Sequence, residues 1–340
     1  MRLFALLALV ACGSASKEPP APAPAPITRP EPAPVIGAGK IERTKIKSEA
    51  LGVEKDLLVY LPAGYDPAGT RRYPVFYYLH GLGGSETDWL EHGKIDRVAD
   101  SLDLQAIIVM PDGDAGFYAD GKTATDYTAC LKNGTGLFDP GAPKAKTCVR
   151  APKYETYMTR DLIAHVDTTY KTIASREGRA IAGLSMGGFG ALTLALRHPD
   201  LYAAAVSHSG VDALLYEGPS PYQKGKVELV RDVKNWGGRL GPFGAWIRGI
   251  FGSELANWQA HDPASLVGKL GPGGPKLYLD CGTEDEFALH NHAAYLHDLL
   301  LDKKIDHEYF SGPGRHDFTF WAQRLPKSLA FLRTNTSPGT

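Results

Sequence analysis

Residues 179–190 read RAIAGLSMGGFG, and this stretch decides the fold. Arg179–Ala182 has the short apolar pattern of a buried strand, and Gly187–Arg197 has apolar residues at helical spacing. Between them, Gly183-Leu184-Ser185-Met186-Gly187 fits G-x-S-x-G, which places a serine on a tight turn from strand to helix. Only small neighbours fit such a turn, and the helix start directs free N–H groups toward the serine oxygen. The stretch predicts an α/β fold with Ser185 as a nucleophile.

Further buried strands and helices alternate on both sides of this stretch. Such alternation is typical of a mostly parallel central sheet with helices on both faces. The fold class expected is therefore α/β, with the α/β-hydrolase fold as its form. The predicted strands are Glu54–Leu61, Val75–Leu79, Gln105–Met110, Arg179–Ala182, Ala203–Ser207, Lys276–Asp280 and His307–Ser311. The predicted helices are Glu155–Thr169, Gly187–Arg197, His290–Leu301 and Pro326–Leu332.

One segment, Leu214–Leu266, breaks the alternation of strands and helices. It is rich in glycine and aromatic residues and has no convincing strand pattern. We interpret residues 214–266 as a cap inserted between two strands. Its aromatic side chains either line a substrate pocket or fill a small core beneath the cap.

A serine hydroxyl needs a base to become nucleophilic, and the base needs an acid to orient it. On this architecture the expected chain order is serine, acid, histidine. Asp285 follows the strand Lys276–Asp280, and His316 follows the strand His307–Ser311. Both therefore lie at carboxyl ends of strands, where such sheets carry their sites. We predict a triad of Ser185, Asp285 and His316, with Glu284 and Asp280 as competing acids.

The loop after the strand Val75–Leu79 reads His80-Gly81-Leu82-Gly83-Gly84, a glycine-rich turn of the kind that forms an oxyanion hole. Acyl chemistry at a serine needs two N–H donors for the oxyanion. We predict the backbone N–H groups of Leu82 and Met186 as these donors, with Gly81 as the alternative to Leu82. His80 is interpreted as a structural residue that shapes the loop.

The N-terminal segment is expected to be an export signal. Met1–Ala11 has one basic residue and a short apolar run, which ends in a lipobox-like Leu9-Val10-Ala11-Cys12. An ordinary signal peptide is the alternative to acylation of Cys12. Residues 12–40 form a Pro/Ala-rich linker, residues 41–334 the hydrolase domain and residues 335–340 a tail. We therefore expect an exported protein, attached by a lipid to the bacterial cell envelope in the periplasm or at the outer membrane.

Charge and cysteine content restrict the possible partners and cofactors. The 340 residues carry 37 basic and 38 acidic side chains, a formal net charge of −1, so nucleic acid is not expected as a partner. Cys130 and Cys148 are candidates for a disulfide, whereas Cys281 is expected to be a buried thiol. The aspartates at 112, 114 and 120 and the histidines at 290, 292 and 297 lack convincing metal-ligand spacing. No metal and no cofactor are expected.

Several strings together resemble the esterase D-type family of α/β-hydrolases, which includes feruloyl and acetyl-xylan esterases, S-formylglutathione hydrolases and mycolyltransferases. The strings are His80–Gly84, Met110–Gly113, Tyr154-Glu155, Gly183–Gly188, Asp280–Phe287 and Gly314–His316. The resemblance implies the same triad and the same oxyanion donors as the residues themselves. Formylglutathione hydrolases usually carry a cysteine where this chain has Gly84, so that substrate is not expected.

The resemblance implies a serine carboxylesterase that forms an acyl-enzyme and acts on a small or carbohydrate-linked acyl ester. Two alternatives remain open at this point. The first is an acyltransferase that moves the acyl group to a sugar or lipid hydroxyl. The second is a non-catalytic envelope-binding protein on a hydrolase scaffold.

Overall fold

The computed structural model describes residues 37–134, 143–235 and 241–339, the last range without the side chains of residues 241–243. All described residues belong to one compact unit. The predicted signal segment, Cys12 and nearly all of the linker lie outside the described residues. No helix in the described part of the chain combines the length and apolar character that a bilayer span requires.

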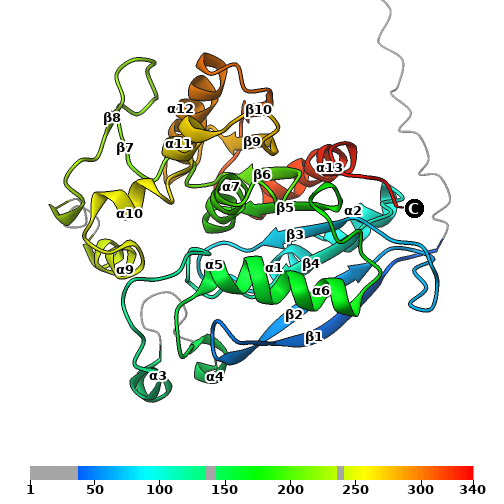
Figure 1. Cartoon of the computed structure of the whole chain (residues 1–340). Coiled ribbons are helices and arrows are strands. Elements are labelled where there is room, and N and C mark those ends of the chain that lie inside the picture. Colours follow the sequence, from blue (N-terminus) through cyan, green and yellow to red (C-terminus); the bar gives the residue numbers. More distant parts are fainter. Residues whose placement is uncertain (1–36, 135–142, 236–240, 340) are drawn as a thin grey trace, which may run out of the picture. The chain divides into compact units, whose positions relative to one another are not determined.

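Within the described residues, eight strands form a central sheet in the order β1-β2-β4-β3-β5-β6-β9-β10 (Figure 1). The pairs β1–β2 and β2–β4 are antiparallel, and all other neighbours in the sheet are parallel. The predicted mostly parallel sheet is therefore confirmed. The strands are β1 Lys40–Ser48, β2 Val53–Leu61, β3 Val75–Leu79, β4 Ile107–Pro111, β5 Arg179–Leu184, β6 Ala204–His208, β9 Lys276–Gly282 and β10 His307–Gly312.

The sheet separates two apolar cores because alternate residues of a strand point to opposite faces. In β3, Val75, Tyr77 and Leu79 enter one core, while Phe76 and Tyr78 enter the other. All five residues are buried, which explains the continuous apolar run that this strand shows in the sequence.

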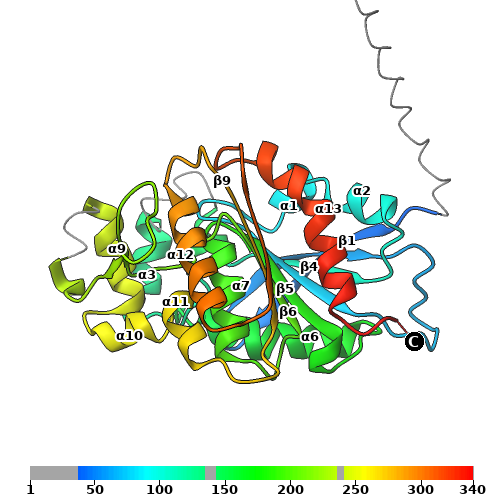
Figure 2. The ribbon, with the colours of Figure 1, turned by 90° about the horizontal axis from the view of Figure 1, so that it is seen from above.

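Helices cover both faces of the sheet, as predicted (Figure 2). The helices α6, Ile163–Thr169, α7, Met186–Arg197, and α12, Leu289–Asp302, pack on the first core. The helices α1, Asp88–Glu91, α2, Ile95–Ser101, and α13, Phe318–Thr334, pack on the second core. The other α-helices of the described residues are α3 Tyr127–Asn133, α4 Lys144–Thr147, α5 Tyr154–Thr156, α9 Gly241–Phe251, α10 Leu255–Gln259 and α11 Pro263–Leu266.

Several elements differ from the sequence-based predictions. The edge strand β1 was not predicted because its alternating charged residues give no continuous apolar run. The predicted helix Glu155–Thr169 contains a π-helical segment, Tyr157–Leu162, between α5 and α6. Helix α13 begins eight residues before the predicted start at Pro326, because the Asp317 carboxylate caps it by accepting the N–H groups of Thr319 and Phe320.

Residues 214–266 lie between β6 and β9 and contain α9, α10 and α11, beside α7 and α12 (Figure 1). The segment also contains two short paired strands, β7, Tyr216–Glu217, and β8, Glu228–Leu229, which the sequence did not indicate. Among its aromatic residues, Phe251 and Trp258 are buried with Phe189 of α7 in the first core. For these two residues the alternative of a small core beneath the cap is the one that the structure supports.

Candidate active site

Ser185 lies at the tight turn between β5 and α7, and its backbone has a positive φ, which is uncommon for a residue other than glycine. Its φ is 53° and its ψ is −119°, and its N–H donates to the carbonyl oxygen of His208, 2.9 Å away. A Cβ at Gly183 would lie 2.3 Å from the Gly187 carbonyl oxygen, and a Cβ at Gly187 would lie 2.5 Å from the Leu79 carbonyl oxygen. The glycines on both sides of the serine are therefore needed for the close approach of the chain.

His316 links Ser185 to Asp285 through two hydrogen bonds. Its Nε2 lies 2.9 Å from Oγ of Ser185, and its Nδ1 lies 2.6 Å from Oδ2 of Asp285. The three side chains come from loops that follow β5, β9 and β10, which end at the same edge of the sheet. The structure thus brings together all three predicted triad residues.

The two competing acids occupy other places. Asp280 is fully buried, lies 2.9 Å from Nδ1 of His208 and accepts a hydrogen bond from Nε of Arg324. Glu284 is exposed, and its backbone N–H donates to the carbonyl oxygen of Gly314. Asp285 is the carboxylate that reaches His316.

The surroundings of Asp285 favour its ionised form. Burial raises the pKa of this carboxyl group, but the hydrogen bond and charge of His316 and the N–H groups of Leu289 and Phe287 outweigh it, so the pKa is lowered. The N–H groups of Phe287 and Leu289 donate to Oδ1 at 2.9 and 3.3 Å, which leaves Oδ2 for His316. The Cys281 thiol lies 3.6 Å from that same Oδ2. Cys281 is buried, as the sequence indicated.

The predicted oxyanion loop lies directly against the nucleophile. A Cβ at Gly81 would lie 3.3 Å from Cβ of Ser185. Among the described residues, the N–H groups of Leu82 and Met186 have no hydrogen-bond acceptor, so both remain free to bind a developing negative charge. Gly81 stays open as the alternative donor.

His80 has the structural role expected from the sequence. Its Nε2 accepts a hydrogen bond from the Gly113 N–H at 2.9 Å, and its Nδ1 lies 2.7 Å from the carbonyl oxygen of Gly81. Since Nε2 accepts, the proton of the neutral ring is on Nδ1 and is donated to Gly81. His80 thereby connects the oxyanion loop to the loop that follows β4.

Comparison with known proteins identifies the family of the chain. The model of the family described as Esterase matches residues 48–332. The chain belongs to the esterase family. The resemblance found in the sequence is thus confirmed.

Two curated relatives each align with about half of this chain. Esterase Rv1288 of Mycobacterium tuberculosis is 34% identical over 178 residues, which are 50% of this chain and 32% of the relative. An endo-1,4-beta-xylanase/feruloyl esterase of Xylanibacter ruminicola is 32% identical over 170 residues, 49% of this chain and 21% of the relative. The chain thus spans a third or less of the length of these relatives.

A solved structure shares the fold over most of the chain. The fluorophosphonate-binding serine hydrolase FphF of Staphylococcus aureus has a TM-score of 0.64 at 22% identity, and the match covers 87% of this chain and 99% of FphF. At this identity the likeness establishes the α/β-hydrolase fold alone.

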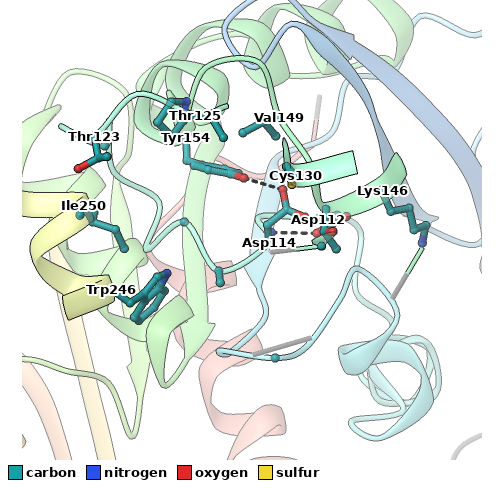
Figure 3. A pocket seen from close by; sticks show the side chains of 18 of the residues that line it. Asp112, Asp114, Thr123, Thr125, Cys130, Lys146, Val149, Tyr154, Trp246 and Ile250 are labelled. Atoms are coloured by element: carbon teal, nitrogen blue, oxygen red, sulfur yellow. Dashed lines mark hydrogen bonds between the residues drawn. The ribbon is translucent and has the colours of Figure 1, made fainter. Parts of the chain in front are cut away.

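A cavity of about 580 Å³ begins at the end of the predicted oxyanion loop (Figure 3). Its lining is mainly apolar and includes Val149, Tyr154, Trp246 and Ile250. Ser185 and His316 do not line it, but Gly83, Gly84 and Ser85 do. The loops that follow β3 and β4 supply part of its wall, while those that follow β9 and β10 carry Asp285 and His316. In the sheet, β5 with Ser185 lies between these two groups of strands. Apart from the cap residues, such as Trp246 and Ile250, the cavity wall therefore comes from the β3–β4 side of Ser185, whereas His316 comes from the other side.

A buried ion cluster fixes one wall of the cavity. Nζ of Lys55 lies 2.8 Å from Oδ2 of Asp112 and 2.7 Å from Oδ1 of Asp114. The hydroxyl of Tyr154 donates to Asp114 (Figure 3). An ammonium group thus occupies the place between the two carboxylates. Within the described residues, no cluster of three histidine, cysteine or acidic side chains has an arrangement that would hold a metal ion.

The structure joins Cys130 and Cys148 in a disulfide, and Cys130 lines the same cavity. The bond closes the segment between α3 and the end of α4. Two hydrogen bonds connect the cap to the neighbouring loop, from the N–H groups of Lys122 and Thr123 to the carbonyl oxygens of Ile250 and Gly249. This wall of the cavity is therefore cross-linked both covalently and through the backbone.

Two aromatic side chains contact His316, and neither contact was predicted from the sequence. Trp321 is buried, with its ring centroid 5.0 Å from that of the imidazole, and its Nε1 donates to Oγ of Ser209. Phe287 contacts the same imidazole at 4.9 Å but is 69% exposed. A sequence carries no pattern for such contacts, because they depend on where separate loops meet.

Proposed function

We propose that the chain is a serine carboxylesterase that works through an acyl-enzyme. The hydrogen-bonded series from Asp285 through His316 to Ser185 carries this proposal. Nε2 of His316 accepts the hydroxyl proton of Ser185 while Oγ attacks the ester carbonyl carbon. The carbonyl π electrons move onto its oxygen, which becomes an oxyanion beside the N–H groups of Leu82 and Met186.

The tetrahedral intermediate then collapses and expels the alcohol. The proton on Nε2 of His316 passes to the leaving oxygen as the C–O bond breaks, which leaves the acyl group on Ser185. Water attacks the acyl-enzyme with His316 again as the base, releasing the acid and restoring the serine. Throughout, the Asp285 carboxylate keeps the proton on Nδ1 and stabilises the imidazolium that forms.

The positions of the site residues also suggest how the substrate lies. The leaving oxygen must come within hydrogen-bond distance of His316, so the alcohol part lies on the β9–β10 side of Ser185. The cavity begins at the oxyanion loop, on the β3–β4 side of Ser185, and is the natural place for an extended acyl group. The proposed substrate is a small or carbohydrate-linked acyl ester, and the name of the xylanase/feruloyl esterase relative supports this class.

The decisive experiment compares Ser185→Ala with the wild-type protein. We expect Ser185→Ala to lose hydrolysis of 4-nitrophenyl acetate and covalent labelling by a fluorophosphonate. The control is Ser253→Ala, which removes an exposed serine hydroxyl outside the site. Labelling and turnover that survive in Ser185→Ala would overturn the proposal. A wild-type protein that does not label would favour a non-catalytic binding role instead.

We further propose that the protein is exported and attached to the cell envelope through acylated Cys12. The lipobox-like sequence and the Pro/Ala-rich tract after it support this proposal. The Cys130–Cys148 disulfide supports an oxidising compartment. Radiolabelled palmitate should enter the wild-type protein and not Cys12→Ser. Equal labelling of the two would contradict the anchor.

A further inference from the structure

The most exposed large apolar side chain in the described part of the molecule contacts the proposed catalytic histidine. The exposed large apolar residues are Leu131 at 40%, Phe287 at 69%, Leu301 at 52% and Phe310 at 37%. Single exposed apolar residues are common and need no explanation by themselves. The position of Phe287 is what distinguishes it, because its ring centroid lies 4.9 Å from that of His316.

The backbone holds Phe287 in place relative to the triad. Its N–H donates to Oδ1 of Asp285 at 2.9 Å, the carboxylate whose other oxygen binds His316. The ring meets the imidazole nearly edge to face, at 76°. A residue of the acid loop thus presents an aromatic surface beside the group that protonates the leaving oxygen.

Support of the imidazole does not account for this exposed surface. Trp321 already packs against His316 at 5.0 Å and is buried, with its Nε1 bonded to Ser209. Phe287 keeps most of its surface in water, so its contact with His316 uses only a small part of the ring. The remaining surface is available to a molecule that enters the site.

Two charged residues, Glu286 and Arg315, adjoin Phe287 and His316 in the chain. Nε of Arg315 donates to Oε1 of Glu286, while Oε2 of Glu286 accepts the backbone N–H of His316 at 3.1 Å. Both charged side chains are largely exposed. A ligand on Phe287 would therefore meet an apolar face beside groups that can bond hydroxyls.

We propose that Phe287 is the surface on which the alcohol part of the ester stacks, and that it selects alcohols carrying a ring with an apolar face. This inference rests on the proposed function. The alcohol oxygen must lie near Nε2 of His316 when it receives its proton, so the adjacent carbon atoms come close to Phe287. An aryl ring and the C–H face of a sugar ring share the chemistry that such a surface binds.

The inference extends to the second half of the reaction. An alcohol that attacks the acyl-enzyme enters where the leaving alcohol departs, because the reverse reaction follows the same path. Its proton goes to Nε2 of His316 as its oxygen forms the new C–O bond, and the same proton then passes to Oγ of Ser185 as the bond to the serine breaks. Phe287 should therefore also influence how the acyl-enzyme divides between water and a ring-bearing alcohol.

The experiment measures kcat/KM for acetate esters of ethanol, cyclohexylmethanol and benzyl alcohol. In Phe287→Ala we expect the ratios of the two ring esters to the ethyl ester to fall about 10-fold, the loss expected when a ring face is no longer buried. Phe287→Tyr should keep the wild-type ratios. The control is Leu301→Ala, which removes a comparably exposed side chain on α12 and should change nothing.

The same variants are then given 4-nitrophenyl acetate with benzyl alcohol or ethanol as acceptor. Phe287→Ala should reduce acetyl transfer to benzyl alcohol relative to ethanol by about the same factor. A fourth ester, methyl 6-O-acetyl-glucopyranoside, distinguishes the two ring sources. If its ratio falls with those of the ring esters, the surface accepts sugars; if not, it accepts apolar rings only.

Equal losses for all the esters would overturn the inference, because they would mean that Phe287 acts only by supporting His316. Unchanged ratios in Phe287→Ala would overturn it as well. Failure of the proposed function is distinguishable, since the wild-type protein would then neither label with a fluorophosphonate nor hydrolyse any of the esters.

Discussion

Asp280 and His208 form a second carboxylate–imidazole pair, fully buried, with Nδ1 of His208 2.9 Å from Oδ1 of Asp280. Arg324 donates to the other oxygen of Asp280, and the backbone carbonyl of His208 accepts the Ser185 N–H. The pair is thus joined to the proposed nucleophile through the backbone, while the hydroxyl of Ser185 is bonded to His316. It explains why Asp280, the acid at the end of β9, is not available to His316.

Asp285 and Asp280 should therefore respond differently when each carboxylate is replaced by an amide. We expect Asp285→Asn to lower kcat by about 10⁴-fold, the loss seen in other triads when the acid no longer fixes the tautomer. Asp280→Asn should instead destabilise the fold by about 3 kcal/mol, because Arg324 loses its buried partner. Ester turnover and urea unfolding of both variants provide the check. Comparable turnover in the two folded variants would contradict the assignment of Asp285.

The turn at Ser185 should tolerate no side chain at Gly183. Its Cβ would lie 2.3 Å from backbone atoms of Gly187, which have no flexible way to move. We expect Gly183→Ala to cost about 1–3 kcal/mol of stability, as overpacking does, and to displace Ser185 enough to remove most activity. At Gly268, by contrast, a Cβ has nothing within 4 Å. Gly268→Ala should behave like the wild-type protein, and a matching loss in both variants would count against the clash.

Asp212 should make the fold less stable as the pH rises toward neutrality. Burial raises the pKa of this carboxyl group to about 7, although a hydrogen bond from Ser207 lowers it in part. The unfolded chain loses the same proton near a pKa of about 3.9, so the folded state binds more protons between these values. Stability therefore falls with rising pH across this window and levels off above it.

Removing the titrating group should remove this dependence. We expect the free energy of unfolding of the wild-type protein to fall between about pH 4 and 7, and we expect this fall to be absent in Asp212→Asn. Urea unfolding at a series of pH values measures both profiles. Profiles that stay parallel across the window would show that Asp212 does not titrate as its burial indicates.

The Cys130–Cys148 disulfide should stabilise the wall of the cavity. The two cysteines are 18 residues apart, and closing a loop of this size contributes about 3 kcal/mol. We expect the double variant Cys130→Ser/Cys148→Ser to lose that stability and to become insensitive to dithiothreitol. Thermal melting with and without reductant measures both effects, with Cys281→Ser as the control that keeps the response. A wild-type melting temperature unaffected by reductant would contradict a stabilising role.

The sequence by itself determined the parts of the fold whose signal is local. Val75–Leu79 is a strand with the predicted bounds, because a strand buried on both faces must be apolar throughout. The pattern around Ser185 is equally local, since a tight turn needs its glycines within two residues of the serine. By contrast, the sequence did not predict the edge strand β1, because its alternating charged residues give no continuous apolar run. It also did not predict the first half of α13, because a proline inside a helix reads as a helix start, whereas α13 continues through Pro326.

Only the tertiary structure decided which side chains meet. Asp280, Glu284 and Asp285 lie within six positions of one another, and the sequence predicts Asp285 while leaving the other two acids as competitors. The choice follows from His208 and Arg324 occupying Asp280, two partners that arrive from β6 and α13. The exposed face of Phe287 and the cavity beyond the oxyanion loop likewise depend on loops that are distant in the chain. Such contacts are long-range, and no local pattern of residues encodes them.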